Sequence, residues 1–378
     1  NPAVPSTIAK YPCTEMGREV ARDVMDIHGG KGIILGPRNY AGRNWQSVPI
    51  AITVEGANIM TRSLMIFGQG AILCHPWVMK EMKSAQLEDP KARIDQFDHA
   101  LFGHISYAIS NAVRAWWFGF TSSRVGTTPG GEYTRRCYRK LNRYSAALAV
   151  MADTSMLLLG GKLKFKESLS GRLGDVLSQL YIASAMLKRY EDQGRPMADH
   201  PLLAWAFHDA IHKIELALSG ALRNFPIRPV GWLLWAVIFP WGRRAEAPSD
   251  RLGHRAAALL MTPCEARDRL AEGLFLEPCE NNPAGRVNSY LPKMILAEPV
   301  ERKFLKALKN SDIEALEFDT QLDEGVREGW ITADERKQLE ALREMTLDTI
   351  MVDDFESWEL RSAGYVEESV ADGHRAAA

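Results

Sequence analysis

Apolar residues recur at every third or fourth position along most of the chain, which is the spacing of amphipathic α-helices. Val20, Val24 and Ile27 share one face of a first helix that runs from about residue 6 to His28. No alternating strand pattern and no repeat of fixed period is visible, so the sequence predicts an all-α protein. Glycine and proline residues separate the later helices, which we expect over residues 57–68, 76–87, 92–123, 130–159, 166–193, 199–223, 249–261, 263–273, 298–309, 311–328 and 333–351.

Residues 29–54 interrupt this helical pattern. They are rich in glycine, proline and asparagine and show little periodicity. We therefore expect an ordered, functional loop here, with a short helix within it.

The composition limits the classes of protein to which the chain can belong. Its 378 residues are enough for about two to three domains. With 46% hydrophobic and 25% charged residues, the chain is globular rather than disordered or fibrous. The formal net charge is −1, so no basic field recruits nucleic acid. The charge is unevenly distributed, because residues 298–378 hold 21 acidic and 10 basic side chains, whereas residues 1–297 hold 26 and 36.

The five cysteines lie far apart and form no CxxC motif, which favours a reduced, cytosolic setting. No uncharged apolar run approaches the roughly 18 residues that span a bilayer. The longest such run, Pro229–Gly242, has 14 residues. The chain begins without methionine just before a helical pattern, and we expect it to be a piece of a longer polypeptide.

That apolar run contains Trp232, Trp235 and Trp241, and arginines flank it at Arg228 and Arg243–Arg244. Tryptophans with basic flanks are typical of segments that lie at a membrane interface. The basic excess upstream of residue 298 also favours contact with anionic lipid. A core helix or a subunit contact would also explain this run, and the residues alone favour one of these two interpretations.

The strongest local signal is the glycine-rich turn His28-Gly29-Gly30-Lys31-Gly32 at the end of the first helix. A helix C-cap followed by a tight turn explains these glycines. A backbone that closely approaches a ligand phosphate explains them too. The spacing and the following residues exclude a Walker loop.

Glu55 follows the apolar stretch Ile50–Val54 and precedes Gly56 at the start of a predicted helix. A carboxylate at this position can complement the positive end of the helix, and the residues alone favour this interpretation. The alternative is a general base, because an apolar neighbourhood raises the pKa of a carboxylate and makes it a better proton acceptor.

His208 and His212 lie one turn apart on a predicted helix, with Glu215 one turn further on, and this spacing can bind zinc. However, aspartate stands where the zinc-protease motif has glutamate, and no distant third ligand is indicated. A zinc-dependent hydrolase is therefore the least favoured function, and we expect no metal site. Two other groupings give no stronger signal: Cys74–His75, and His99 with His104.

Several segments together resemble one protein family. The segments DVMDIHGGKGI and ITVEGANIMTRS resemble the last part of the catalytic domain of acyl-CoA dehydrogenases. FGQGAILCHPWV, LGDVLSQLYIASAMLKRYED and the late VDDF resemble the C-terminal extension of the large bacterial FadE type. The resemblance covers nearly the whole chain. It implies that residues 1–75 end the catalytic helical bundle, that residues 76–361 form a multi-helix extension, and that residues 362–378 are a loose tail.

The resemblance implies an FAD-dependent enzyme that converts a saturated fatty acyl-CoA to the trans-2-enoyl-CoA in β-oxidation. Glu55 matches the catalytic base of the family, which removes the α-proton of the thioester while the β-hydrogen leaves as hydride to the flavin. Gly29 and Gly30 match the flavin-contacting turn, which in this family reaches the cofactor of a neighbouring subunit. Ala57 and Asn58 match positions on the cofactor side that follow the Glu-Gly pair.

Two residues depart from the family pattern. Asp26 stands in place of a glutamine in the turn, and Ala57 stands in place of a threonine. The usual side-chain contacts with the cofactor are therefore lost, whereas backbone N–H contacts remain available. Arg62 matches a basic position of the last bundle helix, where a surface ion pair and a ligand contact are both open. The middle β-domain of the family is not visible, so most of the flavin site and acyl pocket is expected to lie outside this chain, and we expect the chain alone to be inactive.

The resemblance further implies an electron-transfer flavoprotein as electron acceptor and a homo-oligomeric state. We expect a cytoplasmic location, with Trp232, Trp235 and Trp241 as candidate contacts to the inner face of the plasma membrane. The rival hypothesis is a catalytically inert helical module that docks to a partner or to a membrane.

Overall fold

The structure is a computed structural model that describes residues 3–279, 282–311, 317–356 and 358–359. Within these residues the chain is helical and forms no strand, apart from an isolated β-bridge between Cys279 and Asn282. The all-α class predicted from the sequence is confirmed. The tail predicted for residues 362–378 lies outside the described residues.

In chain order the helices are α1 (Ala3–His28), α2 (Gly30–Ile33), α3 (Gly42–Thr53), α4 (Asn58–Met60), the π-helix η1 (Thr61–Gln69), α5 (Gly70–Leu73), α6 (Val78–Ser84), α7 (Pro90–Phe120), α8 (Glu132–Leu159), the 3-10 helix η2 (Gly160–Phe165), α9 (Glu167–Asp192), the 3-10 helix η3 (Met197–Asp199), α10 (His200–Arg223), α11 (Arg228–Ile238), α12 (Asp250–Leu260), α13 (Glu265–Ala271), α14 (Pro283–Lys309), α15 (Phe318–Arg327) and α16 (Ala333–Ile350).

Local signals explain where several of these helices begin. Asp89 accepts hydrogen bonds from two first-turn amides of α7 at 3.2 Å each, and Pro90 occupies a first-turn position where an amide donor is not needed. Thr332 and Glu335 form a capping box at the start of α16. Both helices therefore begin close to the residue that the sequence predicts.

The chain divides into two compact units, and the boundaries between them fall within α1, α3 and α13. The first unit comprises Asn1–Met16 and Pro49–Arg267, and the second comprises Gly17–Val48 and Asp268–Ala378. These units are defined by their internal contacts. The boundary near residue 75 that the resemblance implies stays a prediction.

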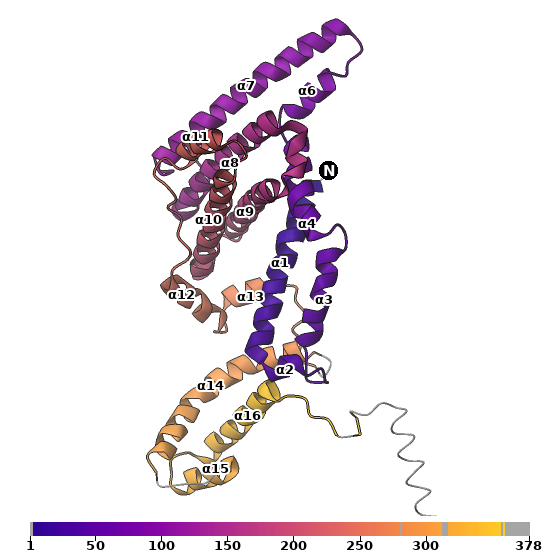
Figure 1. Ribbon diagram of the computed structural model, residues 1–378. Coiled ribbons are helices and arrows are strands. Elements are labelled where there is room, and N and C mark those ends of the chain that lie inside the picture. Colours follow the sequence, from indigo (N-terminus) through magenta and orange to yellow (C-terminus); the bar gives the residue numbers. More distant parts are fainter. Residues whose placement is uncertain (1–2, 280–281, 312–316, 357, 360–378) are drawn as a thin grey trace, which may run out of the picture. The chain divides into compact units, whose positions relative to one another are not determined.

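The core of the first unit lies between α8, α9 and α10, with α7 packed against α8 (Figure 1). Large apolar side chains on these helices are almost fully buried, among them Met151, Leu173, Leu187, Phe207 and Ile214. Burying a side chain of this size contributes about 1.5–3 kcal/mol. This core is therefore the scaffold on which the shorter elements of the first unit rest.

In the second unit, α14 packs along α16 and α15 covers one end of the pair (Figure 1). Their small core includes Phe304, Leu322, Leu339 and Leu342. The structure corrects the start of α14, which we predicted near residue 298 and which begins at Pro283. The helix was not predicted over its first half because it contains Pro292 and Pro299, and proline is rare in helix interiors.

Residues 29–54 are more helical than the sequence predicts. α2 occupies Gly30–Ile33, and the 12 residues Gly42–Thr53 form α3, where we expected a loop with only a short helix. Glycine at its start and Pro49 in its interior are poor helix formers, and they hid the pattern. Asn39 organises the preceding turn, because its Oδ1 accepts the amides of Ala41 at 3.0 Å and Gly42 at 2.8 Å.

By length and composition alone, α8 with the turn that follows it, Glu132–Phe165, could cross a membrane. The bent pair Gly42–Thr53 and Asn58–Leu73 passes the same test only when taken together. Buried core residues of α8, such as Leu141 and Met151, pack against neighbouring helices. Core helices commonly pass this test, so it is weak evidence for a span.

Cys137 on α8 provides a chemical test of this core. Its side chain is buried, and burial raises the pKa of its thiol to about 11, whereas Cys13, Cys74 and Cys279 are exposed. Near neutral pH we expect iodoacetamide to alkylate Cys137 at least about 100-fold more slowly than the exposed thiols, because the reactive species is the thiolate. Peptide mass spectrometry over a time course measures these rates. Equal rates at all four positions would contradict the packing of α8.

Candidate functional site

Glu55 lies in the short turn between α3 and α4, in the first unit. Its φ is 55°, and Gly56 follows with a φ of 89°. A left-handed backbone costs a non-glycine residue roughly 1–2 kcal/mol, so neighbouring contacts must stabilise it. Strain of this kind concentrates at functional positions, which makes this turn the first candidate site.

The side chain of Glu55 is exposed, and its carboxylate has no hydrogen bond or ion pair with the residues that the structure describes. The sequence led us to expect an apolar surrounding. Of the preceding residues, however, Ile52 faces inward, whereas Ile50 and Val54 are 63% and 46% exposed at the end of α3. Within this chain the carboxylate is therefore solvated. Its role as a base stays a prediction.

Lys10 on α1 holds this turn in place. Its Nζ donates to the carbonyl of Gly56 at 2.8 Å and to Oδ1 of Asn58 at 2.6 Å. The hydroxyl of Thr61 donates to the same Gly56 carbonyl at 3.1 Å. These contacts fix the backbone without using the Glu55 side chain, which stays available to a ligand.

The two residues predicted on the cofactor side differ in their surroundings. Asn58 is buried, and its Nδ2 donates to Oγ1 of Thr14 at 2.9 Å and to Oε1 of Glu15 at 2.7 Å. Its side chain is therefore committed to partners within the chain, including Lys10. Ala57 is half-buried in an extended conformation just before α4. Any cofactor contact at these positions would fall to the backbone.

Arg62 forms an ion pair, one of the two roles that the sequence left open. Its Nε lies 2.8 Å from Oδ1 of Asp175, and a terminal nitrogen lies 2.5 Å from Oδ2. The hydrogen bond to Asp175 raises the pKa of Arg62, and Tyr11 also donates to this carboxylate at 3.2 Å. A Cβ at Gly174 would come within 2.5 Å of the Arg62 carbonyl, so glycine allows α9 to approach η1 closely. The pair joins these two helices.

The turn Gly29–Gly30 lies between α1 and α2, in the second unit. The φ of Gly29 is 54°, and no heavy atom lies within 4 Å of the position that its Cβ would occupy. Its amide donates to the carbonyl of Met25 at 3.0 Å and so closes α1. The turn therefore caps a helix, and at Gly29 it also presents an open backbone surface.

Lys31, the next residue, faces away from this surface. It is 3% exposed, and its Nζ donates to the carbonyls of Asp348 at 2.5 Å and Thr349 at 2.9 Å. Burial lowers the pKa of Lys31. Its charge stabilises the C-terminal end of α16, where unpaired carbonyls favour a cation. Lys31 is thus unsuited to bind a phosphate.

The segment after α16 packs on the same turn. Val352 Cγ2 lies 3.4 Å from the Cβ position of Gly30, and Oδ1 of Asp353 accepts the amide of Arg38 at 2.8 Å. A Cβ at Gly36 would come within 2.3 Å of Asp353 Cγ, so only glycine fits there without a shift. The VDDF motif therefore has a structural role beside the glycine turn.

His208, His212 and Glu215 do not converge on a metal position. His212 Nδ1 lies 2.9 Å from the Ala245 carbonyl, and the buried Glu215 carboxylate accepts the Tyr144 hydroxyl at 2.6 Å. Burial lowers the pKa of His208. Within the described ranges these residues belong to no group of three potential ligands.

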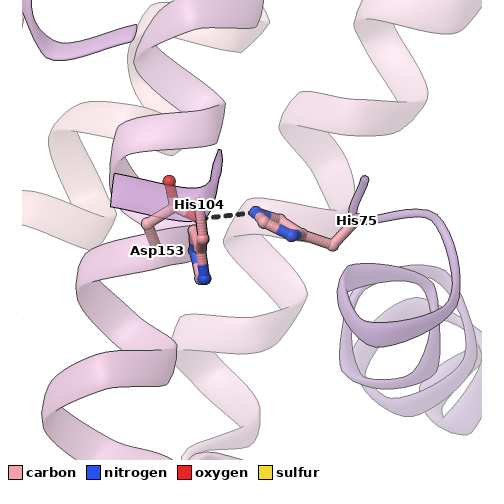
Figure 2. Close-up of side chains that lie close together, drawn as sticks. All are labelled: His75, His104 and Asp153. Atoms are coloured by element: carbon pink, nitrogen blue, oxygen red, sulfur yellow. Dashed lines mark hydrogen bonds and ion pairs between the residues drawn. The ribbon is translucent and has the colours of Figure 1, made fainter. Parts of the chain in front are cut away.

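A different cluster brings together His75, His104 and Asp153 (Figure 2). They come from the loop before α6, from α7 and from α8, and their candidate ligand atoms lie within 4.8 Å of one another. The sequence did not predict this cluster. These residues come together only because α7 packs against both α6 and α8. No spacing in the sequence predicts this packing.

The tryptophan segment is partly exposed. Trp232 and Leu233 on α11 are 67% and 66% exposed, whereas Trp235 is half-buried and packs against the core. Trp241, just after α11, is exposed, and its Nε1 donates to the carbonyl of Phe120 at 2.9 Å. The segment is therefore both a core helix, through Trp235, and an exposed aromatic surface, formed by Trp232 and Trp241.

One family model, described as acyl-CoA dehydrogenase, C-terminal, bacterial type, matches residues 72–355. This match covers more than half of the chain, and the chain belongs to that acyl-CoA dehydrogenase family, a family of oxidoreductases. It confirms the resemblance found in the sequence. The match begins after Glu55 and the glycine turn, so it leaves their roles untested. No solved structure matches the chain.

Proposed function

We propose that this chain is the C-terminal part of an FAD-dependent acyl-CoA dehydrogenase that oxidises a saturated fatty acyl-CoA to the trans-2-enoyl-CoA in β-oxidation. Family membership supports the oxidoreductase class. The resemblance of the segments around Glu55 and Gly29–Gly30 supports the reaction. The structural observation that carries the proposal is the left-handed turn at Glu55. Lys10 and Thr61 hold this turn through the carbonyl of Gly56, so the Glu55 carboxylate stays exposed and available to a ligand.

In this proposal Glu55 removes the α-proton of the acyl thioester. That proton is only weakly acidic, so the negative charge that develops must be stabilised at the thioester oxygen. The backbone N–H of Glu55 is one donor for that oxygen, and its carboxylate takes the proton. Substrate that covers the exposed turn would exclude water from the carboxylate and so increase its proton affinity. FAD, when bound, accepts the hydride that leaves the β-carbon.

The glycine turn fits a contact with a dinucleotide through its backbone only. Gly29 and Gly30 are exposed, and no heavy atom lies within 4 Å of the Cβ position of Gly29, whereas Val352 Cγ2 lies 3.4 Å from that of Gly30. Lys31 is buried against α16, and Asp26 carries a negative charge, so neither side chain suits a phosphate. Contacts at this turn would therefore rest on backbone N–H groups.

The proposal extends to the partners that the resemblance implies. An electron-transfer flavoprotein would accept the electrons, and a homo-oligomer would bring the glycine turn of one subunit to the cofactor of its neighbour. A cytoplasmic location accords with five cysteines that are all free thiols.

Flavin retention tests this function against the rival of an inert module. The whole enzyme that contains this chain is incubated with excess FAD and passed over a desalting column, and its flavin absorbance is recorded. Saturated acyl-CoA and an artificial electron acceptor are then added. We expect retained flavin and formation of enoyl-CoA. A colourless, folded protein without dehydrogenase activity would contradict the proposal and favour the module.

The exposed aromatic surface favours a second role, docking to an anionic membrane. Trp232 and Trp241 are both exposed, and the guanidinium of Arg244 lies 5.9 Å from the ring centre of Trp241. Aromatic rings beside arginine suit the interface between lipid headgroups and acyl chains. This role is compatible with catalysis elsewhere in the same protein.

Replacing Trp232 and Trp241 together by Ser should weaken binding to phosphatidylglycerol vesicles by at least about tenfold, because two exposed aromatic side chains would no longer be buried in lipid. Trp235 is left unchanged, since it packs against the core. Vesicle co-sedimentation measures the effect, with Phe165→Ser as a control at another exposed aromatic residue. Unchanged binding by the double variant would reject the membrane role.

A further inference from the structure

The geometry points to a metal site in the first unit: His75, His104 and Asp153 bind one divalent transition-metal ion, with Zn²⁺ the expected ion. The site lies at the junction of α6, α7 and α8 (Figure 2). It involves none of the residues assigned to flavin chemistry. It therefore stands or falls independently of the proposed function.

The distances between the ligand atoms suit one small ion. His75 Nε2 lies 2.9 Å from Oδ1 of Asp153, and His104 Nε2 lies 3.6 Å from the same oxygen. Ligands bound tetrahedrally to zinc at about 2.0–2.1 Å stand about 3.3 Å apart, and the two measured separations bracket that value. Small side-chain adjustments would place all three ligands around an ion.

One oxygen of the Asp153 carboxylate lacks a hydrogen-bond partner. Its side chain is 11% exposed, and its Oδ2 is buried without a hydrogen-bond partner among the described residues. An unsatisfied buried carboxylate oxygen is costly. A cation bound at this position would compensate it.

Glu81 on α6 orients the second histidine as the outer carboxylate of a metal site does. Its Oε1 lies 2.8 Å from Nδ1 of His104. In the neutral ring this contact places the proton on Nδ1 and turns the lone pair of Nε2 toward Asp153. A lone pair and a carboxylate oxygen face each other favourably only when a cation or a proton lies between them. Carboxylate–histidine–metal arrangements of this kind recur in zinc sites.

His75 must exchange one set of contacts for another. Its Nδ1 faces the amides of Trp77 and Val78 at 3.2 and 3.1 Å, so in the metal-free neutral ring the proton sits on Nε2 and is donated to Asp153. Binding through Nε2 moves this proton to Nδ1 and breaks the two amide contacts. The first turn of α6 should therefore respond to the metal.

The donor set selects the class of ion. Two imidazole nitrogens and one carboxylate oxygen suit Zn²⁺ and its chemical relatives Co²⁺ and Ni²⁺, whereas Mg²⁺ and Ca²⁺ prefer sites made of oxygen ligands. The side chains of His75 and His104 are only 6% and 22% exposed, so the site is largely shielded from solvent. The ion would join α7 and α8 to the loop before α6 and stabilise the first unit.

Titration of the chelator-treated chain with zinc tests the site. Isothermal calorimetry should show one ion per chain, and Co²⁺ should give the visible absorption bands of a tetrahedral complex. Thermal unfolding should shift to higher temperature in zinc, because a ligand that binds only the folded state stabilises it. Absence of stoichiometric binding at micromolar zinc would overturn the proposal.

Matched variants identify the ligands. His104→Ala and Asp153→Asn should weaken zinc binding at least about 100-fold, and Glu81→Gln should weaken it by about 10–100-fold. Glu81→Gln keeps the packing of α6, so it is informative if a ligand variant fails to fold. Cys74→Ser, beside His75, and His99→Ala, on the same helix as His104, should bind zinc like the wild type. Unchanged binding in Asp153→Asn, or its loss in Cys74→Ser, would refute this ligand set.

Discussion

Replacing Glu55 by Gln is expected to lower the turnover of acyl-CoA by about 10²–10⁴-fold, the range that a general base contributes. Glutamine has nearly the same shape but cannot accept the α-proton. The turn itself should persist, because Lys10 and Thr61 hold it through the backbone of Gly56. Flavin content and acyl-CoA binding should therefore stay close to those of the wild type. Steady-state assays with an artificial acceptor measure turnover and KM. Flavin absorbance measures the flavin content.

The matched control is Glu88→Gln, a second exposed glutamate in a turn of the first unit. Its turnover should equal that of the wild type. Wild-type turnover in Glu55→Gln would defeat the assignment of the base. Loss of flavin together with turnover would mean that the substitution disturbs the fold instead.

Replacing Glu215 by Ala is expected to lower the free energy of unfolding of the first unit by about 3–5 kcal/mol, because each buried donor that loses its acceptor costs roughly 1–3 kcal/mol. This carboxylate is fully buried, and it accepts the Tyr144 hydroxyl at 2.6 Å and the amides of Arg244 and Ala245 at 2.9 Å each. The substitution leaves all three donors unpaired and opens a cavity. Urea unfolding followed by circular dichroism gives the free energy.

Asp209→Ala is the control for that measurement, because Asp209 lies on the same helix and pairs with Lys213 near the surface. Its expected cost is at most about 1 kcal/mol. A loss of similar size in both variants would show that Glu215 does not anchor the segment after α11. Arg244 and Ala245 follow Trp241, so this anchor also positions the exposed aromatic surface.

The sequence predicts the long helices well because their stability comes from regular apolar faces. Residues 130–159, 166–193 and 199–223 carry that pattern, and α8, α9 and α10 occupy nearly the same ranges. The length of α3 and the first half of α14 were not predicted, because Pro49 and two prolines of α14 contradict helix propensity. Tertiary packing overrides propensity at these positions.

The candidate site was only partly predictable for a related reason. The position of Glu55 in a tight turn follows from the neighbouring glycine, but its exposure depends on how α3 ends. The buried position of Lys31 depends on α16, more than three hundred residues away in the chain. The cluster of His75, His104 and Asp153 likewise exists only because three separate segments meet. Contacts between residues that lie far apart in the chain cannot be predicted from a local sequence pattern.

Exchange of the substrate's α-hydrogen with solvent tests the central claim, that the carboxylate of Glu55 takes this proton. The flavin-loaded enzyme that contains this chain is incubated in deuterated water with a saturated acyl-CoA, and deuterium at the α-carbon is followed by mass spectrometry. The wild type should incorporate deuterium, and Glu55→Gln should incorporate none above the enzyme-free rate. Equal incorporation by both proteins would show that another group is the base.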